Sequence, residues 1–177
     1  VNFGLSINID NLPTLQKFGE KYRNTVPCGI RLNPHIMAGG NYKISTGHSN
    51  SKFGISIYQL AQIRELVEKY DIQVHGRHID RGSENTETDI FLKMAEILCS
   101  VAVDFPDLKF IDFGSGFKVA YKEGDLVTNI YDVGLKLSKI FNDFCQQYGR
   151  KLELWIEPGK FIVSESGTLL VEANVIK

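Results

Sequence analysis

The sequence lacks the features that would place it in a membrane, on nucleic acid or in a disulfide framework. No apolar run approaches the roughly 20 residues of a membrane-spanning helix, so no membrane partner is expected. The formal net charge is only −1, which gives no electrostatic reason to expect nucleic acid. The three cysteines, Cys28, Cys99 and Cys145, are odd in number and far apart, which favours reduced thiols in a cytoplasmic protein.

Metal-ligand motifs are scarce as well. His35 and His48 lie in or beside a glycine-rich polar stretch, residues 37–54, and have no partner at ligand spacing. We therefore expect no metal site. Apolar residues make up 43% of the chain and charged residues 23%, which is typical of a soluble globular protein with one sizeable core.

Short apolar runs alternate with amphipathic segments along the chain. Strands are expected at 3–8, 28–33, 72–78, 109–113 and 152–156, and helices at 11–22, 57–70, 89–103 and 131–148. Such alternation implies parallel strands with right-handed crossovers, in either a (β/α)8 barrel or a doubly wound sheet. A whole barrel needs about 250 residues, so these five βα units would be its C-terminal part, strands four to eight.

Polar and glycine-rich segments follow the expected strands, which is where both architectures bind ligands. HGRHIDRGSEN spans residues 75–85, with Ser83 offering a hydroxyl and an N–H group. GSG at 114–116 either cradles a phosphate or makes a plain turn, and Val119 excludes the dinucleotide pattern G-x-G-x-x-G. EPGK at 157–160 either holds a ring nitrogen and an anion or is a tight turn flanked by solvated charges.

The order of these motifs resembles that in the diaminopimelate decarboxylase family, pyridoxal-phosphate-dependent enzymes built on a barrel like that of alanine racemase. The matching segments are RLNP at 31–34, SKFGI at 51–55, Gly82-Ser83, DFGSGF at 112–117 and EPGK at 157–160. Five motifs in order over nearly the whole chain are far more specific than any single one of them.

The resemblance implies pyridoxal phosphate as cofactor and assigns roles to particular residues. Glu157 would bond the pyridine nitrogen and keep it protonated. Lys160 stands where the family usually has Arg, and it would meet the phosphate or a substrate carboxylate. Asp80 stands where the family has a ring-stacking histidine. The residues expected at the cofactor are His78, Ser83, Gly114, Gly116, Glu157, Gly159 and Lys160.

The implied activity is decarboxylation of meso-2,6-diaminopimelate to L-lysine and CO2, by a cytoplasmic homodimer or another self-associating form. The alternatives are a decarboxylase acting on arginine or carboxynorspermidine, and a non-catalytic cofactor-binding barrel. Residues 1–167 would form part of the barrel, and residues 168–177 the first strand of a C-terminal β-domain. The family's Schiff-base lysine would lie upstream of Val1, so we expect no turnover by this chain alone.

Overall fold

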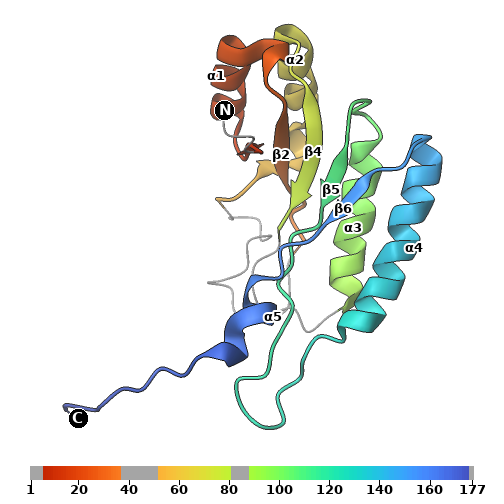
Figure 1. The fold of residues 1–177 in the computed structure, drawn as a ribbon. Helices are drawn as coiled ribbons and strands as arrows, with labels where there is room; N and C mark the ends of the chain where they lie inside the picture. Colours follow the sequence, from red (N-terminus) through yellow and green to blue (C-terminus); the bar gives the residue numbers. More distant parts are fainter. Residues whose placement is uncertain (1–5, 37–51, 81–87, 176–177) are drawn as a thin grey trace.

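A parallel sheet forms the centre of the computed structural model, which describes residues 6–36, 52–80 and 88–175 (Figure 1). Its strands are β1 (Asn8–Ile9), β2 (Cys28–Asn33), β3 (Ile55–Ser56), β4 (Val74–Ile79), β5 (Phe110–Asp112) and β6 (Glu153–Trp155). Four of them match the predicted strands in place and order, and β1 overlaps the strand predicted at 3–8 only at Asn8. β3 was not expected, and it extends the sheet by two residues beside the end of β2.

Four helices connect the strands, and all four were predicted. They are α1 (Leu12–Tyr22), α2 (Leu60–Tyr70), α3 (Thr88–Ala102) and α4 (Ile130–Tyr148), and a fifth short helix, α5 (Gly159–Val163), follows β6. The Asn11 side chain accepts a hydrogen bond from the Thr14 N–H at 2.8 Å and so caps α1. Gly149 ends α4 in the left-handed conformation, with φ of 82°.

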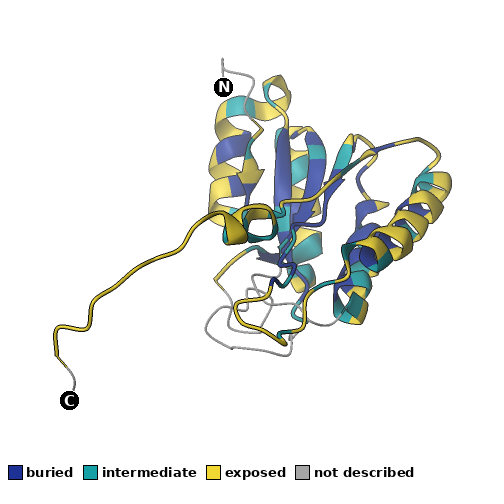
Figure 2. Ribbon diagram, turned by 60° about the horizontal axis from the view of Figure 1, so that its bottom comes forward, coloured by how far each residue is buried: buried dark blue, intermediate teal, exposed yellow. Residues whose placement is uncertain are grey.

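The strand order distinguishes between the two predicted architectures. Neighbouring strands run β1-β2-β4-β5-β6, in sequence order, and every pair is parallel. Helices α1 to α4 lie on one side of this sheet, whereas a doubly wound sheet carries helices on both faces (Figures 1 and 2). The other face encloses a hollow of about 500 Å³ that is lined from both β1 and β6, so the sheet curves. The prediction of a partial barrel is confirmed.

The register of the strands separates an outer row of side chains from an inner row. Ile9, Ile30, Arg77, Ile111 and Leu154 occupy matching positions on five neighbouring strands. Their neighbours one residue later on four of these strands are Arg31, His78, Asp112 and Trp155. Successive side chains of a strand point to opposite faces, so the first row packs under the helices and the second faces the hollow.

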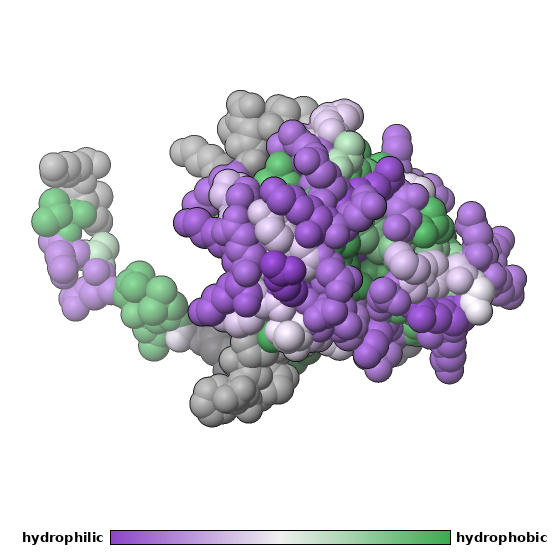
Figure 3. Space-filling model, turned by 90° about the horizontal axis from the view of Figure 1, so that it is seen from above, coloured by the Kyte–Doolittle hydropathy of each residue, from purple (hydrophilic) through white to green (hydrophobic). Residues whose placement is uncertain are grey.

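The call that residues 168–177 form the first strand of a C-terminal β-domain stays a prediction. Residues 168–175 carry no strand, and Leu169, Leu170 and Val171 are 83–88% exposed. A strand needs a neighbour for its N–H and C=O groups, and no described segment pairs with this one. Figure 3 shows the apolar side chains of this segment standing away from the body of the protein.

No helix among the described residues is both long and apolar enough to cross a membrane.

The outer row contains one charged residue in an otherwise apolar core. Arg77 is fully buried, and its guanidinium carbon lies 3.4 Å from the centre of the Phe105 ring. None of its three guanidinium nitrogens has a hydrogen-bond partner among the described residues. Burial lowers the pKa of Arg77 to about 9, because the charged form loses its hydration. Stacking on Phe105 offsets only part of that loss.

Replacement of this buried charge by an apolar side chain should stabilise the protein. We expect Arg77→Met to raise the free energy of unfolding by about 1–3 kcal/mol, since an unpaired buried charge is removed and its volume is kept. Arg64→Met is the matched control, because Arg64 is half exposed in an ion pair with Asp104 and should change stability by less than about 1 kcal/mol. Urea unfolding of both variants measures the difference. A loss of stability in Arg77→Met would contradict this account.

Candidate functional site

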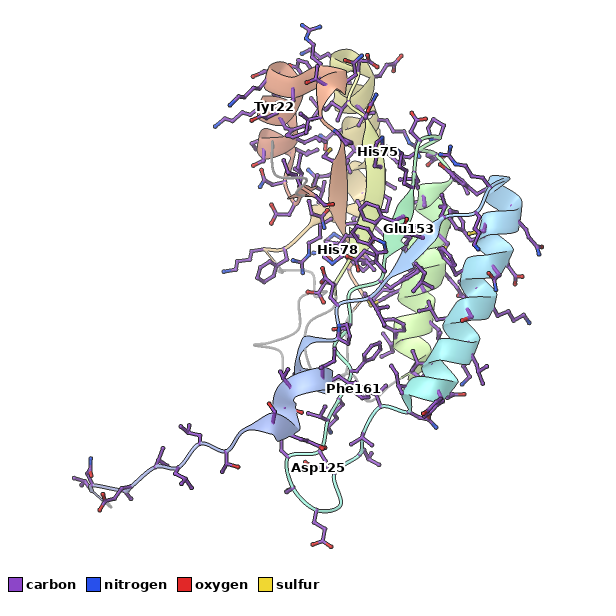
Figure 4. The ribbon with its side chains drawn as sticks, in the orientation of Figure 1. Tyr22, His75, His78, Asp125, Glu153 and Phe161 are labelled. Carbon is purple, nitrogen blue, oxygen red and sulfur yellow. The ribbon has the colours of Figure 1, made fainter. Side chains whose placement is uncertain are left out.

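The ends of β4, β5 and β6 bring polar residues to one mouth of the hollow. His78 and Asp112 are register partners on β4 and β5, and Asp112 is in register with Trp155 on β6. Figure 4 shows His78 toward this end of β4 and His75 toward its opposite end. Because the strands are parallel, the segments that follow them, including Glu157, continue on the same side.

The turn after β5 depends on Gly114. Its φ is +57°, and a Cβ at this position would lie 2.7 Å from the carbonyl oxygen of Ile79. Only glycine therefore allows the chain to pass so close to the end of β4. The Gly114 N–H donates to Oδ1 of Asp112 at 2.9 Å, which orients this carboxylate at the mouth of the hollow.

Backbone hydrogen bonds fix the position of Glu157. Its N–H donates to the carbonyl oxygen of Gly114 at 2.8 Å. Its own carbonyl oxygen accepts from the Ser115 hydroxyl at 2.5 Å and from the Gly159 N–H at 2.8 Å. The GSG and EPG motifs, which lie about 40 residues apart in the sequence, therefore form one bonded unit.

A cavity of about 200 Å³ lies where these two motifs meet. It is lined by Asp80, Ser115, Gly116, Phe117, Glu157, Gly159, Lys160 and Phe161. The Nζ atom of Lys160 is buried and has no hydrogen-bond partner among the described residues. A buried ammonium beside a glycine-rich turn is an arrangement that an anion such as phosphate would satisfy.

Three titratable groups meet beside this cavity. His78 is buried, and its Nε2 lies 3.5 Å from Oε2 of Glu157. Donor atoms of His78, Asp112 and Glu157 all lie within 4.8 Å of one another. Burial lowers the pKa of His78, although the Glu157 carboxylate opposes this. Burial raises the pKa of Asp112, and burial together with the Asp112 charge raises the pKa of Glu157.

The charge of Asp80 is compensated within the site. Its Oδ2 forms an ion pair of 2.9 Å with Nη2 of Arg31, and both side chains are largely buried. Arg31 also lies over the ring of Phe53, 5.0 Å from its centre. Asp80 stands where a ring-stacking histidine was expected. Because it is paired with Arg31, it adds no isolated negative charge to the site.

Most of the residues predicted at the site come together. Gly116, Glu157, Gly159 and Lys160 line the cavity, Gly114 positions the turn, and His78 contacts Glu157. Ser83 lies outside the described residues. The resemblance had already placed Asp80 at the ring-stacking position, whereas the sequence prediction missed Arg31 and Asp112 as members of the site, although both lie in the quoted motifs. Arg31 and Asp112 have in common that they face the hollow at the same level of neighbouring strands. This can be recognised only when it is known which strands pair.

The partial parallel barrel thus has, at the ends of its strands, a cavity with a buried ammonium that a phosphorylated ligand would satisfy. Residues 3–164 match the model of the pyridoxal-dependent decarboxylases, pyridoxal binding domain. The chain belongs to this family, and its cofactor is accordingly pyridoxal phosphate. The orphaned Nζ of Lys160 beside the GSG turn, with a carboxylate close by, fits that cofactor.

Several proteins similar to this chain are named diaminopimelate decarboxylases. The chain is 27% identical over 180 residues to diaminopimelate decarboxylase of Methanothermobacter thermautotrophicus, covering 98% of this chain and 42% of that one. The Staphylococcus aureus diaminopimelate decarboxylase is 31% identical over 175 residues, covering 96% and 41%. A crystal structure of diaminopimelate decarboxylase superposes with a TM-score of 0.79 at 22% identity, covering 89% and 37%. The chain thus spans about two fifths of the length of these relatives.

A pair of glycine substitutions tests the role of the turn after β5. Gly114→Ala should lower the free energy of unfolding by at least about 1–2 kcal/mol, because alanine is strained at positive φ and its Cβ would contact Ile79. Gly134→Ala, inside α4 with open space around it, should instead raise stability by about 0.5–1 kcal/mol. Equal effects of the two substitutions in urea unfolding would show that the turn is not constrained in this way.

Proposed function

We propose that this chain is the cofactor-binding part of an enzyme that decarboxylates meso-2,6-diaminopimelate to L-lysine and CO2. The observation that carries the proposal is the convergence of Lys160, the GSG turn and Glu157 on one cavity. One side of this cavity supplies a cation and backbone N–H groups for a phosphate. The other side supplies a carboxylate for a ring nitrogen. The names of the similar sequences favour this substrate.

Lys160 and Gly116 are proposed to hold the phosphate. A buried ammonium without a hydrogen-bond partner gains a charge-assisted hydrogen bond when a phosphate oxygen reaches it. Gly116, with φ of +96°, lets the backbone come close to the anion. A lysine contacts phosphate as a point charge, so it lacks the two-pronged geometry of the arginine that the family usually has there.

Glu157 is proposed to accept a hydrogen bond from the ring nitrogen of the cofactor. Its backbone is fixed from both sides by Gly114 and Ser115, so the carboxylate approaches the ring from a constant position. Once bound, pyridoxal phosphate supplies an electron sink for loss of the carboxylate. The negative charge of Glu157 keeps the ring nitrogen protonated, which that chemistry needs.

Binding of pyridoxal phosphate is the direct test of this assignment. Trp155 is the single tryptophan of the chain and lines the same hollow as Asp112 and Glu157. We expect added pyridoxal phosphate to quench its fluorescence to saturation. Lys160→Ala should weaken binding by roughly ten- to a hundredfold, since a hydrogen bond to a charged group contributes about 1.5–3 kcal/mol.

The control for Lys160 is Lys151→Ala, an exposed lysine just before β6, at the other end of that strand. It should leave the affinity unchanged. No saturable quenching in the parent chain, or an equal loss in both variants, would refute the proposed phosphate site. The substrate is tested on the longest protein that contains this chain, by CO2 release from meso-diaminopimelate, L-arginine and carboxynorspermidine. Release from L-arginine alone would overturn the choice of substrate.

We further propose that the protein is cytoplasmic and that it self-associates. Three free cysteines, two of them buried, support a reducing compartment. Among the described strands, β1 and β6 end the sheet, and their outer edges offer unpaired backbone groups to another copy. Trp155 and Ile156, on and just after β6, are 36% and 41% exposed, so such pairing would also bury apolar surface.

Light scattering of the chain measures this self-association. We expect a mass above that of a monomer at micromolar concentration. Ile156→Lys, which places a charge beside the β6 edge, should shift the population toward monomer, because a charged edge opposes strand pairing. Leu135→Lys is the control, since Leu135 is also exposed but lies on α4, away from the edge. A monomeric parent chain would count against the proposal.

A further inference from the structure

The buried imidazole of His78 has no hydrogen-bond partner, although it faces two carboxylates. The residue is 4% exposed, and neither ring nitrogen forms a hydrogen bond with the described residues. Its Nε2 lies 3.5 Å from Oε2 of Glu157, which is long for a hydrogen bond. Buried polar atoms are nearly always satisfied, so this nitrogen is expected to meet a ligand.

The surrounding donors lie close enough together to approach one small metal ion. One donor atom each from His78, Asp112 and Glu157 lies within 4.8 Å of the others. In tetrahedral zinc sites, bonds of about 2.0–2.2 Å place neighbouring donors about 3.4 Å apart. The separation of 3.5 Å between His78 and Glu157 already agrees with this value.

The three residues are held in place by the kind of packing and hydrogen bonds that orient metal ligands. His78 and Asp112 are buried register partners on adjacent strands, which limits their movement. The Gly114 N–H holds Oδ1 of Asp112 at 2.9 Å, and such outer hydrogen bonds orient ligating carboxylates. Glu157 is the more exposed member, and its backbone is fixed by Gly114 and Ser115.

The charges and donor types select the class of ion. Two carboxylates and a neutral imidazole carry a charge of −2, which a divalent cation balances. The nearby Arg31 is already paired with Asp80 at 2.9 Å, so its positive charge is compensated. A nitrogen donor and only three protein ligands favour a transition cation over Mg²⁺ or Ca²⁺, which prefer oxygen and more ligands.

We propose that His78, Asp112 and Glu157 bind a divalent transition cation such as Zn²⁺, and that this cation and the cofactor exclude each other. The exclusion rests on the proposed function, in which Glu157 serves the cofactor ring; the cation site itself rests only on the three side chains. Zn²⁺ would therefore act as an inhibitor that competes with pyridoxal phosphate for the cofactor-free protein.

Calorimetric titration of the cofactor-free chain with ZnCl2 tests the site. We expect one ion per chain, and a loss of affinity of about tenfold or more in His78→Gln, Asp112→Asn and Glu157→Gln, since even loss of an outer partner costs ten- to a hundredfold. His75→Gln is the matched control and should bind like the parent, because His75 lies toward the start of β4, away from this mouth. Glu157 is more than half exposed, so its variant is expected to keep the fold.

Cobalt provides a second measurement that identifies the donors. Co²⁺ should give visible d–d absorption without the near-ultraviolet band of a thiolate ligand, because the three donors are nitrogen and oxygen. Absence of binding by the parent chain at high micromolar Zn²⁺, a thiolate band, or unchanged affinity in Glu157→Gln would each overturn the cation site.

A competition experiment between the cation and the cofactor distinguishes failure of the cation site from failure of the proposed function. Added pyridoxal phosphate should displace Co²⁺ and abolish its spectrum, whereas Lys160→Ala should weaken the cofactor and leave Zn²⁺ affinity unchanged. If the cation binds as predicted and the cofactor does not bind at all, the proposed function fails and the cation site stands. If both bind together, the exclusion is wrong.

Discussion

Parallel pairing of β2, β4, β5 and β6 is the constraint on which the site depends. The ladder holds Arg31, His78, Asp112 and Trp155 in one row, although these residues are spread over more than 120 positions of sequence. A shift of one residue in any strand would turn its member of the row into the helix-covered core. The apolar outer row opposes such a shift, because it would bring Ile30 or Ile111 into the open hollow. Packing on the outer face thus determines the chemistry on the inner face.

The chemistry of the mouth arises from groups that the described residues leave unsatisfied. The Lys160 ammonium and the His78 imidazole are buried at nearby positions without hydrogen-bond partners. Burial of such groups costs free energy, which a ligand of matching charge recovers when it binds. An anion suits Lys160 and the GSG turn, whereas a ring nitrogen or a cation suits the carboxylates of Glu157 and Asp112. Opposite charges at the two sides of one cavity orient a ligand that carries both.

Periodicity predicted helices α1 to α4 and strands β2, β4, β5 and β6, whereas β3 and the short helix α5, which carries Lys160, were not predicted. Asn11 before α1 and Gly149 after α4 are local signals whose physical effect does not depend on the rest of the chain. The alternation of strands and helices left the barrel and the doubly wound sheet equally open, because both obey the same local rules. Their difference lies in the side on which each helix packs.

Long-range pairing explains what the sequence did not reveal. The ion pair between Arg31 and Asp80 joins residues 49 positions apart, and no local sequence pattern predicts it. Ligand spacing along the sequence could not bring His78, Asp112 and Glu157 together for the same reason, because they come from three separate segments. The strand predicted at 168–177 stays a prediction, because a strand needs a neighbour to pair with. Its apolar residues have the right local composition, but no described strand lies beside them to accept their hydrogen bonds.

The central claim is that the ends of β4, β5 and β6 form one cofactor site in which Glu157 faces the ring nitrogen. Nitrogen-15 NMR of pyridoxal phosphate labelled at that nitrogen tests it most directly. The account predicts the chemical shift of a protonated pyridine in the complex with the parent chain, and loss of that shift in Glu157→Gln. An unprotonated nitrogen in the parent complex, or the same shift in both proteins, would contradict it.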